Sequence, residues 1–277
     1  MDTLINKKYK IVEKISNGAF GEVFRAINIR TSEEVAIKVE RISKKIKMIK
    51  NETIIYTYLK NVKCVPTVKW YGSDDTNYYM VMNLLGNSLQ KIKYVVDVFS
   101  LKVVFQIAIK VLEIIKLVHE RGLVHRDIKP DNFLFGLNEC KERLFIIDFG
   151  FSKPYVENND HIKEGSTSGL IGSHTYASLN SHDCLELSRR DDLESIFYML
   201  VYFLNGRLDW QELKVNQLKY IKSTKQQFIL KNNLPEELKL FIRYVRNLNF
   251  ADTPDYDYLI NLFLDFLNDP RTVFKNT

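Results

Sequence analysis

The stretch His125–Asn132 reads His-Arg-Asp-Ile-Lys-Pro-Asp-Asn, and the tripeptide Asp148-Phe149-Gly150 follows it along the chain. Within the stretch, Lys129 comes two residues and an asparagine five residues after the carboxylate of Asp127. Phosphoryl transfer requires a carboxylate that accepts or orients a hydroxyl proton, a cation near the moving phosphoryl group, and oxygen ligands for Mg²⁺. The spacing therefore predicts a phosphoryl-transfer site, with a second carboxylate in the tripeptide.

The chain has 277 residues, of which 45% are hydrophobic and 27% are charged. This length suffices for one large domain or for two lobes around a cleft. The longest uninterrupted apolar run, Ile196–Leu204, is too short to cross a bilayer. The N-terminal segment Met1–Lys8 lacks the apolar core of a signal peptide. We therefore expect neither a membrane partner nor secretion.

The three cysteines, Cys64, Cys140 and Cys184, are far apart and odd in number. This pattern argues for a reducing compartment and against a disulfide framework or a metal cluster. We expect a cytoplasmic location, a nuclear location, or both.

The formal net charge is +6, but the lysines are spread along the chain rather than concentrated in one basic tail. A nucleic-acid-binding module would need clustered basic and aromatic residues on one face, which the sequence does not show. We therefore expect no nucleic-acid partner. The positive balance instead indicates a weak attraction for acidic substrates.

Residues 9–82 have the pattern of short strands interrupted by one helix. The helix is expected around Ile46–Leu59. The predicted strands are Tyr9–Ile15, Phe20–Ile27, Glu34–Glu40, Val68–Gly72 and Tyr78–Met82. Together they predict a small antiparallel sheet.

After residue 87 the pattern becomes helical. Apolar residues recur at three- and four-residue steps from Val104 to Val118, which predicts one apolar helix face. Ile196–Leu204 follows the charged Arg189–Asp192, as in a buried helix with a polar N-terminal end. The predicted fold is α+β, a single bilobal domain over 1–277 with a sheet lobe at 1–83, a hinge at 84–87 and a larger helical lobe at 88–277. A ligand is expected in the cleft between the lobes.

The first predicted strand leads into Ser16-Asn17-Gly18-Ala19-Phe20-Gly21. Gly18 and Gly21 let the backbone approach a phosphate, although such glycines also serve hairpin turns. Ser16 stands where a Gly-rich phosphate loop usually has its first glycine, which puts nucleotide affinity in question. A strand rather than a helix is expected next, which argues against a dinucleotide-binding fold.

On the strand Val35-Ala36-Ile37-Lys38, Ala36 and Lys38 face the same way because side chains alternate along a strand. A small alanine leaves room for a planar base, and Lys38 can reach the α- and β-phosphates. A buried lysine needs a carboxylate partner, which Glu52 can supply. Taken singly, each residue is better read as an ordinary exposed side chain. Together with the catalytic stretch they indicate a nucleotide site.

The segment Tyr78–Gly86 is predicted to be a buried strand that continues into the hinge. Backbone groups of Asn83, Leu84 and Leu85 could pair with the adenine edge. Met82 would lie behind the base and Leu134 beneath it. Apolar runs of this kind are mostly core, so only the position of this run marks it as a site.

Within the catalytic stretch, Asp127 is the predicted general base, and Lys129 neutralises charge on the transferring phosphoryl group. Asn132 and Asp148 are the predicted Mg²⁺ ligands, because hard cations prefer oxygen ligands. His125 is predicted to be structural, since the magnesium mechanism leaves no task for an imidazole.

These residues, in this order, resemble a eukaryotic-type protein kinase from about Tyr9 to Phe266. Finer features are similar to the casein kinase 1 family of Ser/Thr kinases. In the substrate-docking stretch Leu170–Asn180, Ser178-Leu179-Asn180 stands where other kinases have Ala-Pro-Glu. The other matching segments are Glu33–Lys38, Pro130–Leu134, Ser188–Ser195 and Pro254–Tyr256. Vaccinia-related and tau–tubulin kinases resemble the chain less closely.

The resemblance implies a monomer that uses ATP and Mg²⁺ to phosphorylate Ser or Thr in acidic or already phosphorylated proteins. It implies that Ser173 supplies a hydroxyl beside the catalytic aspartate, and that Asp192 braces the backbone of the catalytic stretch. The implied ATP contacts are Ile15, Gly18, Gly21, Val23, Ala36, Lys38, Met82, Asn83, Leu84, Leu85, Leu134 and Ile147.

Departures from the resemblance concern the docking of substrate. Thr175 replaces an arginine that forms an anion pocket with a lysine, which Lys219 matches, and Glu212 replaces a glycine nearby. Loss of a guanidinium removes a bidentate, charge-assisted pair with a phosphate. We therefore expect a weakened or rebuilt dependence on phosphorylated substrates.

Two alternatives to an active kinase of this kind remain. One is a pseudokinase scaffold, whose usual mark is loss of the lysine, the catalytic aspartate or the metal-binding aspartate. Lys38, Asp127, Asn132 and Asp148 are all present. The other is a kinase with an altered choice of substrate that does not depend on prior phosphorylation.

Overall fold

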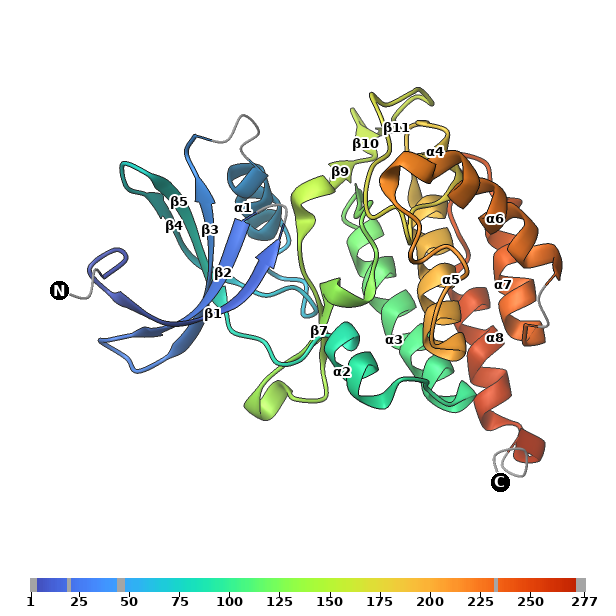
Figure 1. Cartoon of the computed structure of the whole chain (residues 1–277), viewed down its shortest axis with the longest axis horizontal. Helices are drawn as coiled ribbons and strands as arrows, with labels where there is room; N and C mark the ends of the chain where they lie inside the picture. Colours follow the sequence, from blue (N-terminus) through green and yellow to red (C-terminus); the bar gives the residue numbers. More distant parts are fainter. Residues whose placement is uncertain (1–3, 19–20, 44–47, 232–233, 273–277) are drawn as a thin grey trace. The chain divides into compact units, whose positions relative to one another are not determined.

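The computed structural model describes residues 4–18, 21–43, 48–231 and 234–272 (Figure 1). The chain forms two compact units. Unit 1 comprises Met1–Ser88 and Phe133–Gly150, and unit 2 comprises Leu89–Asn132 and Phe151–Thr277. The lobe predicted at 88–277 includes Phe133–Gly150, and in the structure the contacts of this segment group it with the N-terminal sheet.

Unit 1 is built on one antiparallel sheet with the strand order β1-β2-β3-β5-β4. The strands are β1 (Tyr9–Gly18), β2 (Gly21–Asn28), β3 (Glu34–Arg41), β4 (Val68–Ser73) and β5 (Asn77–Asn83). The alternating inward side chains form a core that includes Ala26, Val35, Ile37 and Val81. All five predicted strands are present, although Phe20 lies outside the described residues.

Unit 1 also contains α1 (Met48–Tyr58), which corresponds to the predicted helix; Ile46 lies outside the described residues. Two short strands, β7 (Phe133–Phe135) and β8 (Leu144–Ile146), pair antiparallel. The 3₁₀ turn η2 (Asn138–Cys140) connects them, and η3 (Phe149–Phe151) follows β8.

Unit 2 is mainly helical. Its helices are α2 (Leu89–Val96), α3 (Leu101–His119), α4 (Leu179–His182), α5 (Arg189–Asn205), α6 (Leu218–Lys231), α7 (Glu236–Arg246) and α8 (Tyr256–Asn268). Its short strands are β6 (Leu123–Val124), β9 (Lys153–Pro154), β10 (Val156–Glu157) and β11 (Asp160–His161). Its 3₁₀ turns are η1 (Pro130–Asn132), η4 (Val215–Gln217) and η5 (Pro270–Thr272).

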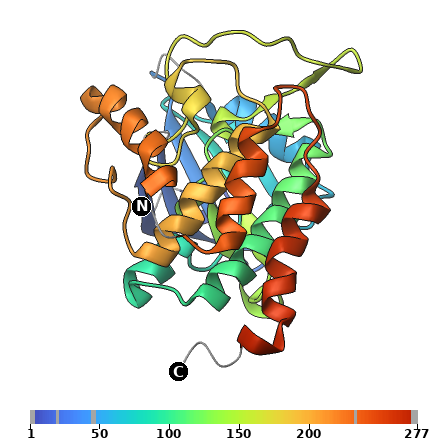
Figure 2. The ribbon, with the colours of Figure 1, turned by 90° about the vertical axis from the view of Figure 1, so that its right-hand side faces the viewer.

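The core of unit 2 lies along α3, which packs against α5 and α8, while α5 also contacts α7 (Figure 2). The predicted apolar face of α3 is buried from Val104 to Val118, and the side chain of Ser100 caps its first turn. Helix α5 is buried on all sides, as predicted for Ile196–Leu204. None of the described helices combines the length and the hydropathy that a membrane span requires. The predicted α+β class is confirmed.

Candidate active site

Unit 2 brings three other predicted site residues into hydrogen-bond contact with Asp127, which is only 3% exposed. One oxygen accepts a hydrogen bond from Lys129 Nζ at 2.5 Å, and the other accepts the backbone N–H of Ser173 at 2.8 Å. The amide nitrogen of Asn132 donates to the backbone carbonyl of Asp127 at 2.8 Å. The carboxylate is therefore held in one orientation by groups from two separate segments.

The backbone before Asp127 is held by a carboxylate from α5. Asp192 accepts the backbone N–H groups of His125 at 2.7 Å and of Arg126 at 2.8 Å. It also bonds His119 Nε2 at 2.9 Å. Arg126 has a positive φ of 68°, which is uncommon for a residue with a Cβ and is maintained by these bonds.

Asp192 and His119 are both buried, and their pKa values follow from that burial and from their contact. Burial alone would raise the pKa of Asp192, but the hydrogen bond and charge of His119 lower it below the ordinary value. Burial lowers the pKa of His119, although the carboxylate opposes this shift. Asp192 is thus an ionised acceptor at neutral pH, as a brace for two N–H groups requires.

In unit 1, Lys38 Nζ on β3 lies 2.7 Å from Glu52 Oε2 and 3.0 Å from Asp148 Oδ1. Glu52 on α1 is 1% exposed, so its charge needs this partner. The backbone N–H of Asp148 donates to the hydroxyl of Tyr56 at 3.0 Å, and the Tyr56 ring packs edge-on against Phe149. The predicted pair of Lys38 and Glu52 is present. The same lysine also bonds Asp148, the predicted metal-binding aspartate.

One ammonium therefore faces two carboxylates. Burial alone would lower the pKa of Lys38, but the charges of Glu52 and Asp148 raise it above the ordinary value. Burial raises the pKa of Glu52 to about 7, and the neighbouring Asp148 adds to the rise against the opposing effect of Lys38. Burial is the main cause of the Glu52 shift and opposes the Lys38 shift, whereas the charge of Asp148 raises both pKa values. A buried cluster of one ammonium and two carboxylates favours the arrival of a further cation.

The sheet places several predicted ATP contacts on one face. Val23 lies opposite Lys38, and Ala36 lies opposite Met82. Directly opposed side chains in an antiparallel pair lie on the same side of the sheet. Gly21 has a φ of 144°, and a Cβ there would lie 2.2 Å from the carbonyl oxygen of Val39, so only glycine fits.

The other predicted ATP contacts also belong to unit 1. Gly18 pairs with Gly21 at the end of the β1–β2 hairpin, and Ile15 lies at a bulge in β1. Leu134 lies on β7 opposite Phe145, and Ile147 directly follows β8. At the end of β5, the Asn83 side chain accepts the backbone N–H of Thr67 at 2.8 Å, and Leu84 and Leu85 follow it, half-buried.

The predicted docking stretch is joined to the catalytic stretch through Ser173. Gly172 before it has a φ of 84°, and a Cβ there would lie 2.4 Å from the carbonyl oxygen of Arg126. The carbonyl of Thr175 accepts Trp210 Nε1 at 2.7 Å. Lys219 is exposed at the start of α6, and no hydrogen bond or ion pair connects it to Thr175 in the described part of the chain. The anion pocket expected from these two residues therefore stays a prediction.

Lys225 on α6 is a residue that the sequence reasoning missed. Its side chain is 0% exposed, and its ammonium donates to the carbonyl oxygens of His174 at 2.9 Å and Ala177 at 2.6 Å. It also lies over the rings of Tyr198 and Trp210. A single lysine in a lysine-rich helix gives no sequence signal that it is buried. Lys225 attaches α6 to the predicted docking stretch.

The predicted Mg²⁺ ligands have suitable chemistry. Asn132 directs its amide nitrogen at the Asp127 carbonyl, which leaves its amide oxygen as the atom for a cation. Asp148 supplies a carboxylate, and both are hard oxygen ligands of the kind that Mg²⁺ prefers. Among the described residues, no cluster of three or more His, Cys, Asp or Glu side chains could hold a metal ion. Each residue, within its own unit, therefore has the chemistry of a magnesium ligand.

A five-stranded sheet with a buried lysine–glutamate pair, followed by a braced His-Arg-Asp stretch on a helical unit, defines a phosphotransferase of the kinase class. The family model for the protein kinase domain matches residues 9–257. The chain therefore belongs to the protein kinase family, with the bilobal kinase fold. Kinases of this family generally use ATP and Mg²⁺ and phosphorylate proteins.

Proposed function

We propose that this chain is an active Ser/Thr kinase of the casein kinase 1 type, which transfers the γ-phosphate of ATP to hydroxyl groups of acidic proteins. The observation that carries the proposal is the orientation of Asp127. Its buried carboxylate bonds Lys129 on one oxygen and the backbone of Ser173 on the other. A pseudokinase scaffold has no need of a carboxylate held in this way.

In the proposed reaction, the substrate hydroxyl loses its proton to Asp127 as its oxygen forms a bond to the γ-phosphorus. The bond from that phosphorus to the bridging oxygen of ADP breaks. Lys129, at 2.5 Å from Asp127 and 3.4 Å from the Ser173 hydroxyl, places a positive charge where the phosphoryl group moves. Ser173 links the docking stretch to the same carboxylate, so substrate and base are positioned together.

On the nucleotide side, Lys38 is the proposed contact to the α- and β-phosphates, and Glu52 holds its ammonium in place. Asn132 and Asp148 are the proposed Mg²⁺ ligands. A bound Mg²⁺ would neutralise phosphate charge during transfer. The adenine would contact Ala36, Met82 and the backbone of Asn83–Leu85, with Leu134 beneath it.

The role of Asp127 is tested by transfer of radiolabelled phosphate from ATP to casein. We expect Asp127→Asn to lower the rate by about 10²–10⁴-fold, because the amide cannot accept the proton. Asp75→Asn, the same change at an exposed residue of the β4–β5 turn, is the control and should leave the rate unchanged. Equal incorporation by wild type and Asp127→Asn would reject the proposed reaction and favour the scaffold.

We further propose that the kinase depends little on previously phosphorylated substrates. Thr175 lacks a guanidinium, so a phosphate would lose a bidentate partner. A phosphorylated peptide and its unphosphorylated twin should react at comparable rates. Thr175→Arg should raise the preference for the phosphorylated peptide. A large preference in the wild type would contradict this proposal while leaving the kinase assignment intact.

A further inference from the structure

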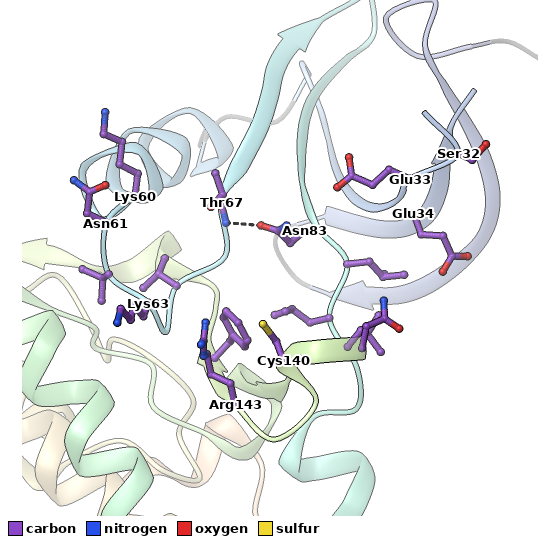
Figure 3. A pocket seen from close by; sticks show the side chains of 18 residues that line it. Ser32, Glu33, Glu34, Lys60, Asn61, Lys63, Thr67, Asn83, Cys140 and Arg143 are labelled. Carbon is purple, nitrogen blue, oxygen red and sulfur yellow. Dashed lines mark hydrogen bonds between the residues drawn. The ribbon is translucent and has the colours of Figure 1, made fainter. Parts of the chain in front are cut away.

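Unit 1 contains a cavity of about 660 Å³ on the side of the sheet end where β5 leads into Asn83–Leu85 (Figure 3). Its walls come from the turn before β3, the loop after α1 and the β7–β8 connection. In Figure 3, Arg143 and Cys140 lie on one wall, across from Thr67 and Asn83. None of the catalytic residues Asp127, Lys129, Lys38 or Glu52 lines it, but Asn83–Leu85, whose backbone is the proposed adenine contact, forms part of its wall.

The cavity carries uncompensated positive charge. Its two acidic residues are already paired outside it, Glu33 with Lys69 at 2.7 Å and Glu34 with Arg25. Its three basic residues are Lys60, Lys63 and Arg143. All three are exposed, and none forms an ion pair within the residues that the structure describes. The carboxylates of a bound ligand could therefore pair with these cations without first breaking an existing ion pair.

The rest of the lining is substantially apolar. Leu84 and Leu85 are half-buried, Leu137 is 39% exposed, and the buried Phe145 also lines the cavity. A purely ionic ligand would leave these side chains in contact with water. An occupant with both carboxylates and apolar side chains satisfies both parts of the lining.

This combination favours a protein segment over a nucleic acid. The affinity of a protein for nucleic acid rises with the number of phosphates that its cations neutralise. Three cations neutralise few phosphates, so binding of a nucleic acid here would be weak. The only aromatic ring of the lining is Phe145, which is buried and offers no face for a base to stack on. We propose that the cavity is a docking site for a short acidic segment with apolar residues, contributed by a partner protein.

The test uses the full chain without nucleotide, so that kinase activity plays no part. The probe is a fluorescein-labelled peptide of about eight residues that alternates pairs of Glu with single Leu. Fluorescence anisotropy should show saturable binding. Lys63→Glu with Arg143→Glu should weaken it at least about tenfold, because two attractive charges become repulsive. The control, Lys102→Glu with Lys110→Glu on the exposed side of α3, makes the same change in net charge and should weaken it less than about twofold.

Two cysteines locate the bound peptide in the wild-type chain, which avoids any dependence on the folding of a variant. Cys140 is half-buried in the cavity, whereas Cys184 is half-buried in unit 2. Saturating peptide should slow the alkylation of Cys140 by N-ethylmaleimide and leave that of Cys184 unchanged. Replacing each Leu of the peptide by Ser should weaken binding at least about fivefold, if the apolar lining contributes.

Three results would overturn the proposal. The first is a lack of charge-specific binding, seen either as no binding at all or as equal weakening by both double variants; equal weakening would indicate attraction to net charge alone. The second is binding without protection of Cys140. The third is protection of Cys140 by an RNA oligonucleotide of about twelve nucleotides at least as strong as that by the peptide, which would favour a nucleic-acid ligand. Loss of phosphate transfer in Asp127→Asn bears on the kinase reaction and on none of these results.

Discussion

At Lys38, one ammonium holds two carboxylates from distant parts of the sequence. Glu52 comes from α1 and Asp148 from the segment after β8, and both lie within 3.0 Å of the same nitrogen. Burial, with a further contribution from the charge of Asp148, raises the pKa of Glu52 to about 7. This residue cluster ties the sheet, the helix and the proposed metal ligand to one another.

Asp148→Asn tests the proposed metal role at the residue scale. The amide keeps the size of the side chain and the backbone bond to the Tyr56 hydroxyl, but it removes one charge from the proposed Mg²⁺ site. We expect the Mg²⁺ concentration for half-maximal phosphate transfer to rise at least about tenfold. Radiolabel transfer across a magnesium titration measures this value, with Asp75→Asn as control. An unchanged titration would argue against Asp148 as a ligand.

Among the elements, α5 has a role beyond packing, because its first turn presents Asp192 to the catalytic stretch. The carboxylate accepts two backbone N–H groups and one imidazole N–H in a buried site. Helix α5 is buried on all sides, so the position of this carboxylate is as rigid as the core of unit 2.

We expect Asp192→Asn to destabilise the protein by about 2–4 kcal/mol, because the amide NH₂ opposes N–H donors and cannot replace the lost charge. The free energy of unfolding from urea denaturation measures this loss. Phosphate transfer should also fall at temperatures where the variant is fully folded, since the backbone before Asp127 loses its brace. A folded variant with wild-type kcat would contradict the bracing role.

Helix α6 contributes the buried ammonium of Lys225, and burial lowers its pKa to about 7 from an ordinary value of 10.5. Between these values the unfolded chain binds the proton and the folded chain releases it. The contribution of Lys225 to stability therefore rises with pH over this range and is lost as pH falls through about 7.

Lys225→Met tests this dependence. The difference in free energy of unfolding between wild type and variant should increase by up to about 1.4 kcal/mol per pH unit from pH 7 towards pH 10.5. Urea denaturation at several pH values measures it. Lys102→Met, at an exposed residue of α3, is the control and should show no such slope. A flat difference for Lys225→Met would mean that the buried lysine stays protonated.

For the whole molecule, the net charge of +6 is expected to act through long-range attraction. Such attraction is screened by salt, whereas contacts in a buried site are screened much less. The KM for an acidic peptide should therefore rise at least about threefold from about 50 mM to about 300 mM NaCl. The KM for ATP under the same conditions separates this effect from general inhibition. A KM for the peptide that is insensitive to salt would contradict the attraction.

Local patterns predicted much of the fold, and they are also the basis on which the site residues are proposed. The apolar steps along α3 and the alternation on β3 depend only on nearby residues, and both elements formed as expected. The burial of Lys225 could not be predicted, because its partners are carbonyl groups of a segment far away in the sequence. The grouping of Phe133–Gly150 with the sheet depends likewise on non-local contacts.

The sequence by itself determined which chemical groups are available. Asp127, Lys129 and Asn132 lie within one short stretch, so they stay near one another however the rest of the chain folds. Only the tertiary structure decided which groups meet. Ser173 reaches Asp127, and Glu52 reaches Lys38. The physical reason is that these contacts close long loops, and a loop closes where packing and charge together offset its entropy.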